Sequence, residues 1–328
     1  MIFKEIKAFI QELLLHDKAT WKDEFGNFKV VYFNNFYKKW SKFNDCKVIK
    51  SHYIKIPVDN IGKYDKIITI GGFLVHNMGK IEAEKLNKKL ITIPVPLSND
   101  SFGTNRCSSG ADEKEASYEC VFPNKVVFDL ELLTDIGVEK NIYGFGEYTG
   151  LYFSIIDYYL KTKKSPDIKL LNYITTNFFE IFNFYINNNY EEFLKRLSAM
   201  LVFKCIVMRS NLKHEIGCGI DHSFARVLEI DYGMNHGRSV YLGCILSSVL
   251  FPEWEIWGLS TTCLVDVGLK LNVIVPSDIN LLKNVNVKEL IAKAITVRKK
   301  RRTMLNNLSA ERISENFHLF KSSYNGVY

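Results

Sequence analysis

The sequence lacks the cysteine patterns that are typical of disulfide-bonded proteins and of zinc-binding domains. Its seven cysteines are an odd number, and none stands in a CxxC arrangement. A zinc ribbon needs such close pairs, and a disulfide framework needs an even set, so the pattern argues against both classes. It favours reduced thiols, and we therefore expect a cytoplasmic protein.

Long apolar runs are also missing. No eighteen residues follow one another without a polar interruption, and the apolar stretch YLGCILSSVLF is too short to span a bilayer. The opening stretch MIFKEIKAFIQELLLHDKAT has acidic residues and helical periodicity, so it is not expected to be a signal peptide. The sequence thus predicts no membrane span.

Concentrated charge is scarce as well. The formal net charge is +7, but the lysines are scattered and the one dense basic run is RKKRR at 298–302. Such a run is typical of a solvated helix end. We therefore expect no nucleic-acid partner.

What is present is an ordinary globular composition over 328 residues, enough for two domains. In the first part of the chain, apolar β-branched runs alternate with a helical stretch that extends from the Gly71-Gly72 pair to about residue 89. Alternation of this kind predicts a parallel sheet with covering helices. The candidate strands are 28–33, short pieces within 47–58, 64–70, 89–95 and 125–130.

The character of the sequence changes after about residue 135, where apolar residues recur at helical spacing and strand patterns nearly vanish. We therefore predict an α/β domain over 1–138 and an all-α domain over 139–328. Pro166 stands between two expected helices, as a helix breaker should. The expected helices are 144–163, 167–187, 190–210, 234–250 and 285–300.

The pair Gly71-Gly72 follows the apolar run IITI and precedes the expected helix. Glycines at a strand end let backbone N–H groups approach a phosphate, and the N-terminus of a helix favours an anion. The same residues could form nothing more than a tight turn between a strand and a helix. From the residues alone, both interpretations stay open.

Two histidines stand near the start of expected helices. His222 lies in DHSFARVLE and His236 in MNHGRSVYLG, where Gly237 leaves room beside the ring. Arg226 is four residues after His222 and shares its helix face. A single histidine on such a helix is more often structural, but neutral imidazole is also a common metal ligand.

A carboxylate lies between glycines in GFGEYTG, where Glu147 opens a largely apolar helix. It could be a charge stabilised by the helix dipole. It could also be a third metal ligand, because one carboxylate and two imidazoles leave coordination positions open for substrate oxygens. Spacing alone leaves both readings standing.

Taken together, these stretches resemble the glycerol-1-phosphate dehydrogenase group, within the superfamily of iron-containing alcohol dehydrogenases, glycerol dehydrogenases and dehydroquinate synthases. The resemblance runs from about residue 64 to residue 316, and its pieces come in the family's order. They are IITIGGFLVHNMGK, IPVPLSNDSFGT, NKVVFDLELL, GFGEYTGLYFSIIDYYL, CGIDHSFARVLE, MNHGRSVYLG and RRTMLNNLSAERISE.

The resemblance implies a dehydroquinate synthase-like fold, with a Rossmann-like N-terminal domain that binds NAD or NADP and an all-α domain that binds one divalent metal. Zinc is the first expectation for the ion, and nickel, iron and manganese also suit the donor set. The implied metal ligands are Glu147, His222 and His236. The implied cofactor-contacting residues are Gly71, Gly72, Asn77, Ser98 and Thr104. The implied substrate-contacting, catalytic residues are Asp100 and Arg226.

The resemblance also implies an activity: a metal-dependent, NAD(P)-linked oxidoreductase that interconverts a small secondary alcohol and a ketone. Glycerol 1-phosphate and dihydroxyacetone phosphate are the alcohol and the ketone that the resemblance implies first. The partners would be a small phosphorylated substrate and, by analogy, a second copy in a homodimer. Arg226 replaces a histidine of the family pattern, and its fixed charge favours a substrate that carries a phosphate or carboxylate.

Two alternatives stay open. Glu147 stands where the dehydrogenases have Asp and dehydroquinate synthases have Glu, which favours a sugar-phosphate cyclase. Phe73 replaces a glycine and Asn77 replaces an aspartate in the nucleotide-binding turn, which favours a repurposed member with an impaired cofactor site.

Overall fold

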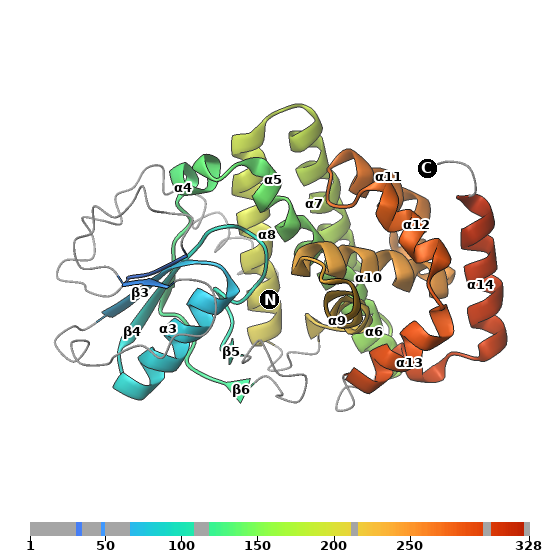
Figure 1. Cartoon of the computed structure of the whole chain (residues 1–328), viewed down its shortest axis with the longest axis horizontal. Coiled ribbons are helices and arrows are strands. Elements are labelled where there is room, and N and C mark those ends of the chain that lie inside the picture. The colour runs from blue at the N-terminus through green and yellow to red at the C-terminus, as the bar shows by residue number, and fades with distance from the viewer. Residues whose placement is uncertain are drawn as a thin grey trace. The chain divides into compact units, whose positions relative to one another are not determined.

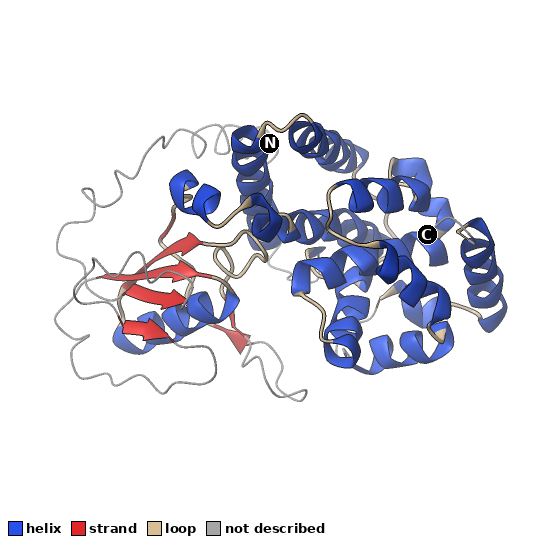
Figure 2. Cartoon of the chain, turned by 45° about the horizontal axis from the view of Figure 1, so that its top comes forward, coloured by secondary structure: helices blue, strands red, loops and turns tan. Residues whose placement is uncertain are grey.

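The computed structural model describes residues 31–34, 47–49, 66–107, 118–210, 216–297 and 303–324. The opening stretch and the basic run 298–302 lie outside the described residues. The chain divides into two compact units, Met1–Asn141 and Ile142–Tyr328. Each unit has its own secondary-structure class, as Figures 1 and 2 show.

The first unit contains a five-stranded, entirely parallel sheet with the strand order β2-β1-β3-β4-β7 (Figure 2). Parallel pairing requires crossover connections, which the alternation of strand and helix patterns predicted. A separate antiparallel pair joins β5 to β6. The strands are β1 (Val31–Asn34), β2 (Lys47–Ile49), β3 (Lys66–Gly71), β4 (Lys89–Pro94), β5 (Arg106–Cys107), β6 (Tyr118–Glu119) and β7 (Lys125–Val126).

Helix α3 (Phe73–Leu86) connects β3 to β4 and packs on them (Figure 1). The contact is close because of Gly79, where an added Cβ would lie 2.1 Å from Cγ2 of Thr69 in β3. Small apolar side chains fill the interface, and removing their surface from water stabilises the unit. This core cluster comprises Ile67, Val75, Ala83 and Leu90.

The last strand of the sheet is shorter than the sequence predicts. Of the expected strand 125–130, only Lys125–Val126 forms β7. The reason is Asp129, whose side chain accepts a hydrogen bond from the backbone N–H of Leu132 and so caps helix α4 (Leu130–Asp135). The cap begins a helix where hydrophobicity alone predicts more strand.

The second unit is helical throughout its described residues, and the predicted fold class is therefore confirmed. Among those residues, no helix combines the length and apolar character needed to cross a bilayer. Its α-helices are α6 (Tyr143–Lys161), α7 (Ile168–Ile186), α8 (Tyr190–Ser210), α9 (Ile220–Tyr232), α10 (His236–Leu250), α11 (Thr261–Lys270), α12 (Pro276–Asn284), α13 (Val287–Val297) and α14 (Ala310–Ser323). Short 3-10 helices lie at Pro252–Trp257 and Met304–Asn307, and α5 (Val138–Asn141) ends the first unit.

Glycines bring α6, α9 and α10 unusually close together. A Cβ added at Gly146 of α6 would lie 2.0 Å from the carbonyl oxygen of Gly237 in α10. A Cβ at Gly243 of α10 would lie 2.2 Å from the carbonyl oxygen of Asp221 in α9. No larger residue fits at either contact. The backbones of the three helices therefore lie close enough for side chains from all three to meet.

Candidate metal centre

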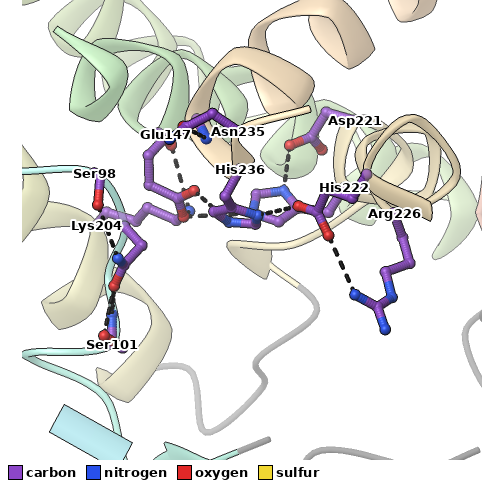
Figure 3. A network of polar contacts seen from close by, with 12 residues as sticks. Ser98, Ser101, Glu147, Lys204, Asp221, His222, Arg226, Asn235 and His236 are labelled. Carbon is purple, nitrogen blue, oxygen red and sulfur yellow. Dashed lines mark hydrogen bonds and ion pairs between the residues drawn. The ribbon is translucent and has the colours of Figure 1, made fainter. Parts of the chain in front are cut away.

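The three predicted metal ligands come together in the second unit (Figure 3). Glu147 lies on α6, His222 lies in the first turn of α9, and His236 is the first residue of α10. One potential ligand atom from each residue lies within 4.8 Å of the other two. Residues that are far apart in the sequence therefore form one compact carboxylate–imidazole cluster.

The imidazole nitrogens of the cluster face the carboxylate of Glu147. His222 Nε2 lies 3.4 Å from Oε1, and His236 Nε2 lies 2.9 Å from Oε2. Despite its nearness to His236, Oε2 accepts no aligned hydrogen bond within the described part of the chain. The Glu147 side chain is buried, whereas that of His236 is 39% exposed and forms the accessible edge of the cluster.

Two further carboxylates orient the imidazoles. Asp221 Oδ2 lies 2.5 Å from Nδ1 of His222, and Glu229 Oε1 lies 2.5 Å from Nδ1 of His236. Asp221 is itself held, because the hydroxyl of Ser154 donates to its Oδ1 over 2.7 Å. A carboxylate at Nδ1 keeps that nitrogen protonated and leaves the Nε2 lone pair free for a metal.

A buried lysine completes the cluster. Lys204 on α8 is fully buried, and its ammonium forms an ion pair with Oε1 of Glu147 (Figure 3). The same Nζ lies 3.3 Å from the backbone carbonyl oxygen of Glu147. Lys204 is not among the site residues predicted from the sequence. The single lysine within the apolar stretch AMLVFKCIVM is nevertheless a usable signal, since a lysine is rarely buried without a partner.

The charges of the cluster support one another. Burial opposes ionisation of Glu147, but Lys204 and the two imidazoles hold the pKa of its carboxyl well below the usual range. Burial likewise opposes the charged form of His236, yet Glu147 and Glu229 raise its pKa to about 10. Without a metal, Glu147 is therefore an anion surrounded by cations, which is the charge state that a metal ligand requires.

Arg226 lies on α9 one turn beyond His222, and its side chain is 32% exposed. Its guanidinium lies 3.3 Å from Oε2 of Glu229, the residue whose other oxygen faces His236. Arg226 is therefore linked through one carboxylate to the predicted ligand set. Arg238 instead forms a two-pronged ion pair with Asp278, which joins α10 to α12.

The predicted glycine turn lies in the first unit at the junction of β3 and α3. Gly71 has φ +152°, a backbone conformation that residues with a side chain rarely adopt, and a Cβ there would lie 2.9 Å from Val75. Gly72 caps α3, and a Cβ added to it would meet no atom of the residues that the structure describes within 4 Å. Phe73 begins the helix and is half-buried. The turn is thus a formed strand–glycine–helix junction.

The other residues predicted for the first unit have differing environments. Asn77 is buried, and its Oδ1 lies 3.4 Å from Nζ of the equally buried Lys80. Thr104 is buried, whereas Ser98 and Asp100 are partly exposed in the segment that follows β4. Lys80 also donates to the carbonyl oxygen of Arg106 over 2.7 Å, so it ties α3 to β5.

The first unit has a parallel sheet, and the helical second unit holds a carboxylate–imidazole cluster that could bind a metal. The sequence comparisons show which known proteins this chain is similar to. A family profile described as iron-containing alcohol dehydrogenase matches residues 44–135. A glycerol-1-phosphate dehydrogenase [NAD(P)+] of Methanococcus maripaludis strain C6 is 23% identical over 264 residues, covering 77% of this chain and 78% of the relative.

Further comparisons agree. The enzyme of the same name from Methanococcus vannielii is 25% identical, and the match covers 78% of this chain and 79% of the relative. The crystal structure of a probable glycerol dehydrogenase from Sinorhizobium meliloti 1021 superposes with a TM-score of 0.62 at 13% identity, covering 94% of each chain. The chain is therefore similar to iron-containing alcohol dehydrogenases and glycerol dehydrogenases in sequence and in fold, which confirms the resemblance and the fold predicted from its motifs.

Proposed function

We propose that the chain is a metal-dependent, NAD(P)-linked oxidoreductase that interconverts a small secondary alcohol and a ketone. The observation that carries the proposal is the convergence of Glu147, His222 and His236, with a carboxylate placed behind each imidazole. The metal and substrate would bind in the domain 139–328, and the dinucleotide would bind in the domain 1–138. Glycerol 1-phosphate and dihydroxyacetone phosphate are the first substrate pair to test.

The donor set fits a divalent cation. Oε2 of the buried Glu147 and Nε2 of His236 lie 2.9 Å apart, so an ion that displaces the proton of Nε2 can bind to the lone pairs of both atoms. One carboxylate and two imidazoles suit zinc first, and nickel, iron or manganese as well. When bound, such an ion supplies a Lewis acid that polarises a carbonyl oxygen or lowers the pKa of a carbinol.

The residues of the chain contribute orientation and charge. Asp221 and Glu229 accept from Nδ1 of the two imidazoles and so fix the tautomer in which Nε2 can bind a metal. Arg226 would receive an anionic group of the substrate, because a guanidinium binds phosphate or carboxylate through two donors. Asp100 would bind substrate hydroxyl groups.

The nucleotide turn supports the cofactor half of the proposal. Among the described residues, no atom occupies the space that a side chain at Gly72 would fill, so a pyrophosphate could approach the N-terminus of the 14-residue helix α3. Gly71 and Gly72 would supply backbone contacts, and Asn77, Ser98 and Thr104 would complete the site. The bound dinucleotide would carry the hydride, while the chain orients the reacting carbon.

One observation favours a second function. Glu147 is the ligand type that the resemblance assigns to dehydroquinate synthases, so a sugar-phosphate cyclase is the alternative. A cyclase would co-purify with tightly held NAD and show no net redox change. A repurposed member would lack the metal, the nicotinamide cofactor or both.

Titrating the metal-loaded protein with NADH and NADPH, followed by cofactor fluorescence, separates these functions. Micromolar, reversible binding supports the dehydrogenase, and a panel of phosphorylated ketones then identifies the substrate. Failure to bind either cofactor at one metal ion per chain contradicts the proposal. The His236→Gln variant is the matched control, since it should lose metal and activity while leaving the buried Glu147–Lys204 pair and cofactor binding unchanged.

A further inference from the structure

Lys204 is a buried cation in contact with a predicted metal ligand. Its side chain is fully buried on α8, and its ammonium forms an ion pair with Oε1 of Glu147, whose side chain is 1% exposed. Burying a lysine and a glutamate together is costly unless each compensates the other's charge. Glu147 is thus both the counter-ion of Lys204 and a candidate ligand of the metal.

The two roles compete for the same carboxylate. A divalent ion bound by Glu147 and the two imidazoles would lie near the ammonium and be repelled by it, because the buried site screens charge poorly. Lys204 nevertheless has a second acceptor, since its Nζ lies 3.3 Å from the backbone carbonyl oxygen of Glu147. The ammonium can therefore give up Oε1 and stay hydrogen-bonded inside the helical unit.

We propose that Lys204 is a built-in cation that competes with the divalent metal for Glu147. In the metal-free chain it neutralises the carboxylate and holds the ligand set together. In the metal-bound chain it weakens the affinity for the ion and makes the ion exchangeable. The inference rests on the metal site of the proposed function and adds a residue that controls it.

The charges around the cluster fit this role. With a divalent ion bound, the ion, Lys204 and Arg226 together carry one positive charge more than the three carboxylates of Glu147, Asp221 and Glu229 can balance. Replacing Lys204 by a neutral residue would remove this excess positive charge and its repulsion of the ion, and would leave Glu147 without its buried counter-ion when no metal is bound. A variant of this kind should therefore bind the ion more tightly and be less stable without it.

The Lys204→Met variant tests this directly, because methionine keeps the length of the side chain and removes its charge. Lys195→Met is the matched control: Lys195 lies on the same helix and is also ion-paired, but with Glu191 and Glu192 near the surface. The dissociation constants of Zn²⁺ and Co²⁺ are measured by competition with a chelator. The thermal midpoint Tm is measured with and without metal.

For Lys204→Met we expect metal binding at least about tenfold tighter than wild type, a lower Tm without metal and a larger Tm increase when metal is added. Lys195→Met should behave as wild type in metal binding. Unchanged or weaker metal binding by Lys204→Met, with wild type binding one ion per chain, would overturn the role of Lys204 alone. Absence of metal binding by wild type would instead overturn the proposed metal site.

The variant could fail to fold without metal, and a second measurement covers this case. The unfolded variant is then refolded in the presence and absence of Zn²⁺, and its helical content is followed by circular dichroism. Recovery only with Zn²⁺ supports the proposal, because the ion would replace the missing cation. Failure in both conditions assigns Lys204 a purely structural role and contradicts it.

Discussion

His222 and Asp221 are neighbours in the chain, and their side chains meet: Nδ1 of the imidazole lies 2.5 Å from Oδ2 of the carboxylate. Both side chains are buried, and the other carboxylate oxygen of Asp221 accepts a hydrogen bond from the hydroxyl of Ser154. The ring of His222 is thereby fixed with Nε2 toward Glu147 (Figure 3). This fixed orientation leads to the first prediction.

Replacing Asp221 by Asn should weaken metal binding by about 10–100-fold, because the amide can donate to Nδ1 and shift the proton to Nε2. Chelator competition measures the affinity. Asp266→Asn, which changes an exposed carboxylate paired with Lys270, is the control and should leave it unchanged. Equal affinities in the two variants would mean that Asp221 does not orient His222.

Gly150→Ala should damage the centre through packing. The added methyl would lie 2.5 Å from Oδ2 of Asp221 and 2.7 Å from Cγ1 of Val240. Overpacking of this kind costs about 1–3 kcal/mol, which exceeds the roughly 1 kcal/mol that alanine gains over glycine in a helix. Denaturant unfolding should report lower stability, and metal affinity should fall with it. A variant as stable as wild type would show that Asp221 can move freely.

Arg226→Gln should reduce discrimination in favour of phosphorylated substrates. If the guanidinium binds a phosphate, kcat/KM for a phosphorylated ketone should fall about 10–100-fold, which corresponds to a charged hydrogen bond of about 1.5–3 kcal/mol. The unphosphorylated ketone should lose much less. Arg196→Gln, which changes a surface arginine paired with Glu180, is the control. Equal losses on both substrates would contradict the role of Arg226, provided that metal content is unchanged.

Gly72→Ala should separate cofactor binding from stability. A Cβ at this position meets no atom of the described part of the chain within 4 Å, and the backbone conformation (φ −97°) suits alanine. We therefore expect stability within about 0.5 kcal/mol of wild type. If a pyrophosphate approaches this backbone, NADH affinity should fall about tenfold or more. Unchanged NADH affinity in a fluorescence titration would mean that the cofactor does not bind at this turn.

His76 should make the stability of the first unit depend on pH. Burial, aided by Lys80, lowers its pKa from 6.5 to about 3, so the folded state keeps the imidazole neutral while the unfolded state takes up a proton below pH 6.5. Stability present at neutral pH is therefore lost as the pH falls, by about 2 kcal/mol between pH 7 and pH 5.

The matched variant for this prediction is His76→Asn, which keeps a polar group near Nδ1, where His76 contacts Thr69 at 2.9 Å. Chemical denaturation at pH 7 and pH 5 should show a smaller difference in unfolding free energy than in wild type. His318→Gln changes an exposed histidine and should retain the wild-type difference. The same pH dependence in His76→Asn would assign the effect to other groups.

Much of the fold follows from local pattern. The run IITI predicts a strand of a parallel sheet, because a strand buried on both faces is apolar at every position. The spacing after residue 135 predicts helices, because a helix buried along one stripe is apolar at every third or fourth position. The short strand β7 was harder to foresee. There the side chain of Asp129 accepts a hydrogen bond from the backbone N–H of Leu132 and caps a helix, although the apolar sequence around it predicts a strand.

The candidate site is only partly readable in the sequence. Motif order singles out Glu147, His222 and His236, and the structure brings them together, although their role as ligands stays a prediction. Asp221 and Glu229 lie within a quoted motif, but hydropathy does not indicate which carboxylate faces which ring. Lys204 belongs to no motif. Its role depends on its contact with Glu147, a residue of another helix that lies 57 positions away in the sequence.

The rate of NADH and NADPH oxidation with dihydroxyacetone phosphate, measured while zinc is added stepwise to the metal-free protein, tests the central claim most directly. We predict that oxidation of one or both cofactors begins with the first additions and saturates at one ion per chain. Nickel, iron and manganese should be titrated in the same way. No turnover of either cofactor with dihydroxyacetone phosphate or the ketone panel, at one bound ion per chain, would contradict the account.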